Sequence, residues 1–274
     1  MSLSNYEISQ DYLDGSYNNI WNAPDGPSRL ARWSQESIRV RADNNNIVRH
    51  HYGDNERNII DYISSDEQTK PCMIFIHGGY WQTNSPDTFT LFSKGVQEHH
   101  WSTAIIGYPL APEASLSTIL HDVNTAVTKL VSIRKERGHN GKLIVVGTSA
   151  GGCLASLLLE RDEIDSGVAI SGVFELAPLK DTYLNEKLNL SDAEIKHLSP
   201  FRRPSTKKPF HIVYGHNELA TVIANSVAYH AKRMRDGAAG ELVEISDTDH
   251  FSILEGLTSG SSQLTKLICK LDKS

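Results

Sequence analysis

The chain has 274 residues, 39% of them hydrophobic and 22% charged, which is enough for one sizeable α/β domain spanning residues 1–274. The net charge of −6 argues against a nucleic-acid-binding surface, and neither a membrane-spanning apolar run nor a signal peptide is visible. The three cysteines are too widely spaced for a metal site or a disulfide framework, which predicts a cytoplasmic protein: Cys72, Cys153 and Cys269.

The amino-terminal segment, residues 1–45, is polar but carries aromatic side chains at intervals. Aromatic residues in so polar a stretch predict that it packs on the domain. A helix is expected over residues 28–42, with Ser28 as its N-cap. Two short strands are expected next, at 47–52 and 58–63, because each is rich in β-branched and aromatic residues and a turn separates them.

From residue 71 onward, short apolar runs alternate with helical segments. This alternation predicts a mostly parallel sheet covered by helices on both faces, with the strands' carboxyl ends at the edge where ligands bind. The strands are predicted at 73–76, 103–106, 143–146, 167–170, 210–214 and 241–245. The helices are predicted at 87–98, 116–137, 153–160, 221–235 and 252–271. The proline-containing segment 176–208 interrupts the alternation and is expected to form a small cap over that edge, with an ordinary surface excursion as the alternative.

A Gly-x-Ser-x-Gly turn, Gly147-Thr148-Ser149-Ala150-Gly151, lies between an apolar strand and a helix. This arrangement is the nucleophile elbow of α/β-hydrolases, in which small neighbours let strand and helix approach and a strained turn exposes the serine. We therefore predict Ser149 as the nucleophile. The alternative is a tight turn with an incidental serine.

A serine hydroxyl needs a general base, and the base needs an acid that orients it. His250 lies between the last predicted strand and the last predicted helix, where this fold places the base. Glu218 is the only carboxylate in the loop after strand 210–214, so it is the predicted acid. Asp247 and Asp249 neighbour the histidine in sequence and are expected to be turn residues.

The sequence His77-Gly78-Gly79-Tyr80-Trp81 directly follows the strand at 73–76 and predicts an oxyanion loop. The backbone N–H groups of Gly79, Tyr80 and Ala150 are the expected donors. The histidine of this loop is expected to hold it by hydrogen bonds. Two roles stay open for Tyr80 and Trp81, which either line the substrate pocket or pack beneath it.

The His77–Trp81 loop and the serine elbow at Gly147–Gly151 together resemble the kynurenine formamidase (arylformamidase) group of α/β-hydrolases. That group borders the hormone-sensitive-lipase-like esterases. The stretch Tyr108-Pro109-Leu110-Ala111-Pro112-Glu113 is similar to the Tyr-Arg-Leu-Ala-Pro-Glu of those esterases. Two positions depart from the formamidase pattern: Thr148 stands where histidine is usual, and Glu175 where aspartate is usual. Other positions fit that pattern along nearly the whole chain: Tyr17-Asn18-Asn19, Trp33, Tyr52-Gly53, Asp61, Ser199-Pro200 and Asp249-His250-Phe251.

The resemblance implies hydrolysis of N-formyl-L-kynurenine, or of related aryl formamides and small esters. Together with the composition and the serine mechanism, it leads us to expect a small-molecule substrate, no nucleic-acid or membrane partner, and no metal or organic cofactor, while a homodimer stays open. A small-acyl carboxylesterase and a non-catalytic binding protein remain as alternatives. The residues that the resemblance carries over are Ser149, Glu218 and His250 as triad, and Gly79, Tyr80 and Ala150 as oxyanion donors. From their place in the loop, Tyr80 and Trp81 are the candidate substrate contacts.

Overall fold

A computed structural model describes residues 9–273, and its centre is an eight-stranded sheet in the order β1-β2-β4-β3-β5-β6-β7-β8. Strand β2 runs antiparallel to β1 and β4, and all other neighbouring strands are parallel. The predicted mostly parallel sheet is therefore confirmed. The strands are β1 (Ile47–His51), β2 (Ile59–Ile63), β3 (Cys72–Ile76), β4 (Ser102–Ile106), β5 (Leu143–Thr148), β6 (Ser166–Ile170), β7 (Phe210–Gly215) and β8 (Leu242–Ile245).

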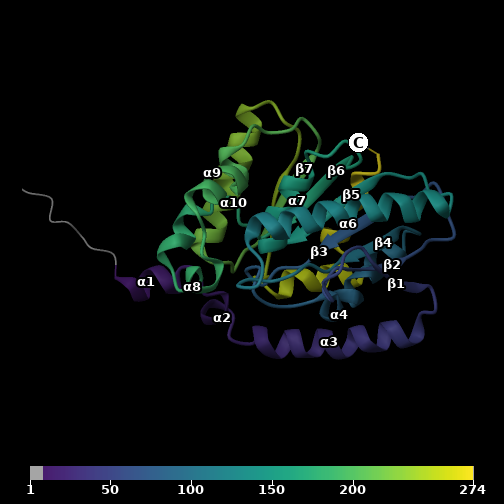
Figure 1. Cartoon of the computed structure of the whole chain (residues 1–274), viewed down its shortest axis with the longest axis horizontal. Helices are drawn as coiled ribbons and strands as arrows, with labels where there is room; N and C mark the ends of the chain where they lie inside the picture. The colour runs from purple at the N-terminus through teal and green to yellow at the C-terminus, as the bar shows by residue number, and fades with distance from the viewer. Residues whose placement is uncertain (1–8, 274) are drawn as a thin grey trace, which may run out of the picture.

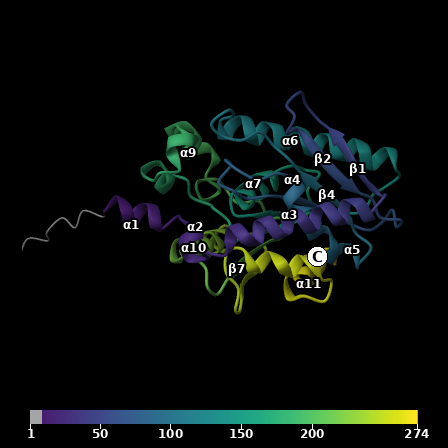
Figure 2. The same ribbon diagram turned by 90° about the horizontal axis from the view of Figure 1, so that it is seen from below.

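Helices cover both faces of this sheet (Figures 1 and 2). One face packs against α6 (Leu116–Glu136), α7 (Ala150–Leu158) and α10 (Ala220–Arg235). The other packs against α3 (Gly26–Asp43) and α11 (Gln263–Lys270). The central strands β3, β4, β5 and β6 are buried along their whole length because both of their faces are covered.

Helix α6 shows how the sequence builds these layers. The Ser115 side chain caps its amino terminus by accepting the N–H of Thr118. Its buried apolar residues recur every three or four positions, so one stripe faces the sheet. That stripe comprises Leu116, Ile119, Val123, Ala126, Val127, Leu130 and Ile133.

Two predicted helices are wrong as single elements. Residues 87–98 form three short pieces, α4 (Pro86–Phe89), η1 (Thr90–Ser93) and α5 (Lys94–Gln97). The expected final helix is divided into η4 (Ser252–Thr258) and α11, because the small residues at 259–262 break it and the Ser262 side chain caps a new start.

The amino-terminal segment is mostly helical, with α1 (Gln10–Gly15) and α2 (Asn19–Asn22) preceding α3; residues 1–8 lie outside the described part. The predicted cap of α3 is wrong. The helix begins at Gly26, and Ser28 lies inside it, because a proline with no N–H fits the first turn. The remaining short elements are η2 (Ala177–Asp181), α8 (Asn185–Leu188), α9 (Asp192–Leu198) and η3 (Pro200–Arg202).

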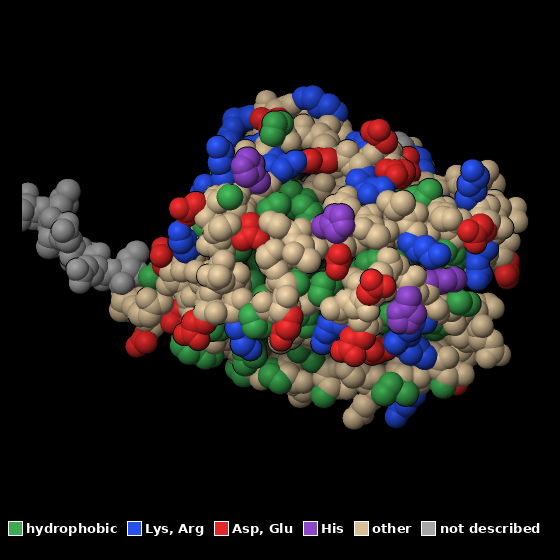
Figure 3. Space-filling model, in the orientation of Figure 1, with side chains coloured by type: hydrophobic (Ala, Val, Ile, Leu, Met, Phe, Trp, Pro, Cys, Tyr) green, Lys and Arg blue, Asp and Glu red, His purple; other side chains and the backbone are tan. Residues whose placement is uncertain are grey.

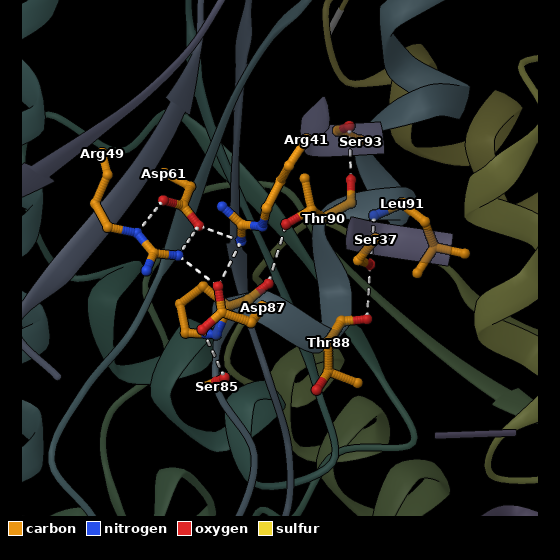
Figure 4. Close-up of polar contacts among 11 residues, drawn as sticks. Ser37, Arg41, Arg49, Asp61, Ser85, Asp87, Thr88, Thr90, Leu91 and Ser93 are labelled. Atoms are coloured by element: carbon orange, nitrogen blue, oxygen red, sulfur yellow. Dashed lines mark hydrogen bonds and ion pairs between the residues drawn. The ribbon is translucent and has the colours of Figure 1, made fainter. Parts of the chain in front are cut away.

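A buried carboxylate attaches α3 to the sheet (Figure 4). Asp61 on β2 has a fully buried side chain and pairs with Arg41 of α3 and with Arg49 of β1, the latter at 2.8 Å. Asp87 at the start of α4 pairs with the same two arginines, at 3.3 and 2.6 Å. Two guanidinium groups offset the cost of burying Asp61, and their hydrogen bonds lower its pKa despite burial.

The face seen in Figure 3 carries charges of both signs. Figure 3 shows acidic and basic side chains interspersed over one whole face. Among residues 9–273, no helix combines the length and the apolar character that a membrane span requires.

Candidate active site

Four strands end at one edge of the sheet, and each leads directly into a residue singled out by the sequence. Strand β3 leads into the loop that begins at His77, and β5 leads into Ser149. The loops after β7 and β8 carry Glu218 and His250. Parallel strands place their carboxyl ends together, so residues far apart in sequence meet at this edge.

Ser149 occupies a strained turn between β5 and α7. Its φ is +52° with ψ −120°, a conformation that non-glycine residues rarely adopt. The neighbouring glycines permit this turn: a Cβ on Gly147 would lie 2.0 Å from the Gly151 carbonyl oxygen, and one on Gly151 would lie 2.1 Å from the Ile76 carbonyl oxygen. The structure therefore has the local form of the predicted elbow.

Glu218 and His250 form a buried pair. The Nδ1 atom of His250 lies 2.9 Å from Glu218 Oε2, and the Glu218 side chain is fully buried. The Leu219 N–H donates to the other carboxylate oxygen at 3.1 Å. Burial alone would raise the pKa of Glu218, but His250, the Ser171 hydroxyl and the Leu219 N–H together lower it, so the group is a carboxylate at neutral pH.

Asp249 is not part of this pair. Its Oδ1 atom accepts the backbone N–H groups of Phe251 and Ser252, each at 2.8 Å, which is the turn role expected for it. The turn fixes the backbone on either side of His250.

Ser149 and His250 line one pocket of about 220 Å³ at the sheet edge. Among the hydrogen bonds of residues 9–273, the His250 ring pairs with Glu218 through Nδ1, and none joins it to the Ser149 hydroxyl. Catalytic hydrogen bonds are often long without substrate and shorten when it binds. The structure thus joins Glu218 to His250 directly and brings His250 beside Ser149 in a shared pocket.

The loop after β3 turns sharply over Ser149. Gly79, Tyr80 and Trp81 have φ values of +111°, +48° and +58°. A Cβ on Gly78 would lie 2.8 Å from Ser149 Cβ, so only glycine lets the loop approach this closely. No acceptor within residues 9–273 pairs with the backbone N–H of Gly79, Tyr80 or Ala150, the three predicted oxyanion donors.

His77 is a buried structural residue of this loop. Its ring stacks on Tyr108 with centroids 4.3 Å apart, and the Tyr108 hydroxyl donates to the His77 carbonyl at 2.7 Å. Burial lowers the pKa of His77 to about 4. The imidazole is therefore neutral at pH 7, and its Nδ1–H donates to the Gly78 carbonyl oxygen at 2.9 Å.

The two aromatic residues of the loop differ in position. Tyr80 lines the pocket, and its hydroxyl donates to the Tyr17 carbonyl at 2.8 Å. Trp81 is fully buried and packs in the core on the α6–α7 face, so of the two roles left open for it, it takes the one beneath the loop and does not line the pocket as a substrate contact.

Sequence reasoning missed most of the pocket wall. These residues come from the start of α2, from the loop after the oxyanion motif and from the 176–208 segment; only Asn18 and Asn19 belong to a stretch that fits the formamidase pattern, and no site role was predicted for them. They are Asn18, Asn19, Ile20, Gln82, Thr83, Asn84, Tyr183 and Leu184. A group of three or more histidine, cysteine, aspartate or glutamate residues suited to a metal ion is absent from the described residues.

A second, smaller space also borders Ser149. This side cavity measures about 40 Å³ and also contacts Gly79 and His250. Its walls are mostly apolar: Leu30, Trp33, Phe89, Phe251 and Leu254. Since a cavity of about 10–15 Å³ on a comparable measure already holds a water, 40 Å³ admits a group of roughly two or three heavy atoms.

A family model described as alpha/beta hydrolase fold matches residues 73–249. A kynurenine formamidase of Danio rerio is 26% identical over 287 aligned positions, which cover 98% of this chain and 97% of that protein. A crystal structure from Silicibacter sp. TM1040, described as a candidate thioesterase, has a TM-score of 0.85 and 22% identity over 94% of this chain and 98% of its own. The esterase LipW of Mycobacterium marinum has a TM-score of 0.74 and 15% identity over 94% and 91%. The predicted fold and the resemblance to kynurenine formamidases are confirmed.

Proposed function

The chain belongs to the alpha/beta hydrolase fold family and is a hydrolase, and from this premise we propose that it cleaves an aryl formamide such as N-formyl-L-kynurenine through an acyl-enzyme intermediate. The substrate is a small molecule, and no nucleic acid or membrane takes part. The kynurenine formamidase of Danio rerio, similar along nearly the whole chain, supports this choice of substrate.

In the proposed mechanism, His250 removes the proton of the Ser149 hydroxyl as its oxygen attacks the formyl carbonyl carbon. Glu218 holds the ring so that Nδ1 keeps its proton and Nε2 accepts the new one. The N–H groups of Gly79, Tyr80 and Ala150 stabilise the oxyanion of the tetrahedral intermediate. His250 then protonates the departing aryl amine, and water hydrolyses the formyl ester of Ser149 by the same steps to give formate.

The observation that carries the formamide substrate is the side cavity beside Ser149. Its volume of about 40 Å³ admits only a small acyl substituent, and a formyl carbon, which bears nothing larger than hydrogen on its acyl side, fits within that limit. The larger pocket of about 220 Å³, which also borders Ser149, is lined by Tyr80 and Tyr183 and suits the aromatic amine. Longer acyl chains would meet Trp33 and Phe89.

A small-acyl carboxylesterase is the second candidate, and one observation favours it. N-formyl-L-kynurenine carries a carboxylate, yet the residues described as lining the larger pocket include no lysine or arginine that would pair with it. Asn18, Asn19 and Gln82 supply neutral amide groups instead. An uncharged ester would need no cationic partner in this pocket.

A comparison of kcat/KM for N-formyl-L-kynurenine, formanilide, p-nitrophenyl acetate and p-nitrophenyl butyrate separates the two candidates. The formamidase proposal predicts that kcat/KM for N-formyl-L-kynurenine exceeds that for the acetate ester by at least about tenfold, and that kcat/KM for the butyrate ester is lower than that for the acetate ester. Turnover of the esters without turnover of either formamide would establish the carboxylesterase instead. The Ser149→Ala variant is the control, since it should lose activity toward every substrate.

A further inference from the structure

Two peptide groups of the oxyanion loop have their carbonyl oxygens held by hydrogen-bond donors from residues 77–84. The Gly78 carbonyl oxygen accepts Asn84 Nδ2 at 3.1 Å and His77 Nδ1 at 2.9 Å. The Gly79 carbonyl oxygen accepts the backbone N–H groups of Gln82 at 2.9 Å and Thr83 at 3.2 Å. In a planar trans peptide the N–H points away from the C=O, so holding each carbonyl fixes the direction of the N–H that follows it.

Those following N–H groups belong to Gly79 and Tyr80, the proposed oxyanion donors. The Gly79 carbonyl is held by two backbone donors of its own turn and by the Thr83 hydroxyl at 3.3 Å. The Gly78 carbonyl, by contrast, depends on two side chains. One of them, His77, is buried and stacked in the core. The other, Asn84, borders both the larger pocket and the side cavity.

Asn84 is itself held in place for this contact. Its φ is +78°, in the left-handed region that asparagine tolerates better than most residues. Arg57 Nη1 donates to its carbonyl oxygen at 2.8 Å. The Nδ2 atom also lies 2.6 Å from where a Cβ on Gly79 would stand, so the amide is packed directly against the loop.

We propose that Asn84 is a positioning residue of the oxyanion hole: its side-chain amide holds the Gly78 carbonyl and thereby aims the Gly79 N–H at the tetrahedral oxyanion. The inference rests on the proposed serine mechanism but not on which substrate is natural. A donor that is aimed correctly matters most in the transition state, so loss of Asn84 should lower kcat more than it changes KM.

The test uses Asn84→Asp, which keeps the shape of the side chain but turns a donor into an acceptor facing a carbonyl oxygen. Asn84→Gly is the second variant, because glycine accepts the positive φ without strain. Asn140→Asp is the matched control, an exposed asparagine near the opposite edge of the sheet whose side chain has no hydrogen bond among the described residues. Each is assayed with p-nitrophenyl acetate, which either candidate enzyme would cleave.

We expect Asn84→Asp to lower kcat at least about tenfold with KM within about twofold, Asn84→Gly to lower it in the same direction by less, and Asn140→Asp to leave it unchanged. The inhibition constant of an aryl trifluoromethyl ketone, which forms a tetrahedral oxyanion with the serine, should rise by about the same factor as kcat falls. Full kcat in Asn84→Asp, a rise in KM alone, or unchanged ketone inhibition would each overturn the inference. Ester activity without formamide activity would refute only the formamide substrate and leave this test intact.

Discussion

Replacement of Glu218 by glutamine tests the buried pair at the centre of the proposed site. The Glu218 side chain has no exposure, and its oxygen lies 2.9 Å from His250 Nδ1. In the transition state the imidazole becomes positively charged, and the glutamine offers no negative charge to stabilise it. Unit charges about 4 Å apart interact by about 4 kcal/mol at an effective dielectric constant near 20, which corresponds to about three powers of ten in rate.

A second effect acts in the same direction. The glutamine amide can donate to Nδ1 and so favour the ring tautomer whose Nε2 already carries a proton and cannot accept another from Ser149. We therefore expect kcat for p-nitrophenyl acetate to fall by about 10³ to 10⁴, with little change in KM. Glu244→Gln is the matched control, because Glu244 pairs with His216 at 2.8 Å but on the exposed surface. If Glu218→Gln kept more than a tenth of the original kcat, the assignment of Glu218 as the orienting acid would be wrong.

Three further predictions concern the walls and supports of the site. Leu254→Ala enlarges the side cavity and should raise the ratio of kcat/KM for p-nitrophenyl butyrate over acetate by about tenfold or more; an unchanged ratio would show that this cavity does not receive the acyl group. Burial lowers the pKa of His77 from 6.5 to about 4, so between these two pH values the unfolded state binds a proton on this histidine and the folded state does not. The free energy of unfolding should therefore fall by up to about 3 kcal/mol as pH drops through this window, and this loss should disappear in His77→Gln urea melts. Asp61→Asn leaves Arg41 and Arg49 without their buried partner and should lower the free energy of unfolding, measured by urea melts, by about 2–3 kcal/mol. This loss is small for a broken buried ion pair because both arginines are partly exposed. A loss below about 1 kcal/mol would contradict this role of Asp61.

Sequence patterns located the strands well, because each buried strand is a continuous apolar run that helical segments separate. Ser149 and His250 were identifiable for a related reason, since this fold places its reactive residues directly after particular strands. Glu218 could be predicted as the acid by elimination, because its loop holds no other carboxylate. Their approach in space follows from strand order and direction, which the alternation of elements already indicates.

The short elements could not be predicted in the same way. Helices as short as α1, α2 and α4 have little stability of their own and form here through contacts with the domain. The role of Trp81 stayed open because an aromatic residue in a loop suits a pocket wall and a buried core equally. Asn84 precedes Ser85-Pro86 and is typical of an ordinary turn, so its contact with the Gly78 carbonyl was visible only in three dimensions.

Reaction with a fluorophosphonate probe, followed by peptide mass mapping, tests the central claim most directly. The account predicts one label per chain, attached to Ser149, with labelling abolished in Ser149→Ala and slowed at least about a hundredfold in His250→Ala. A label on a different residue, or undiminished labelling of the Ser149→Ala variant, would contradict the claim that Ser149 is the nucleophile.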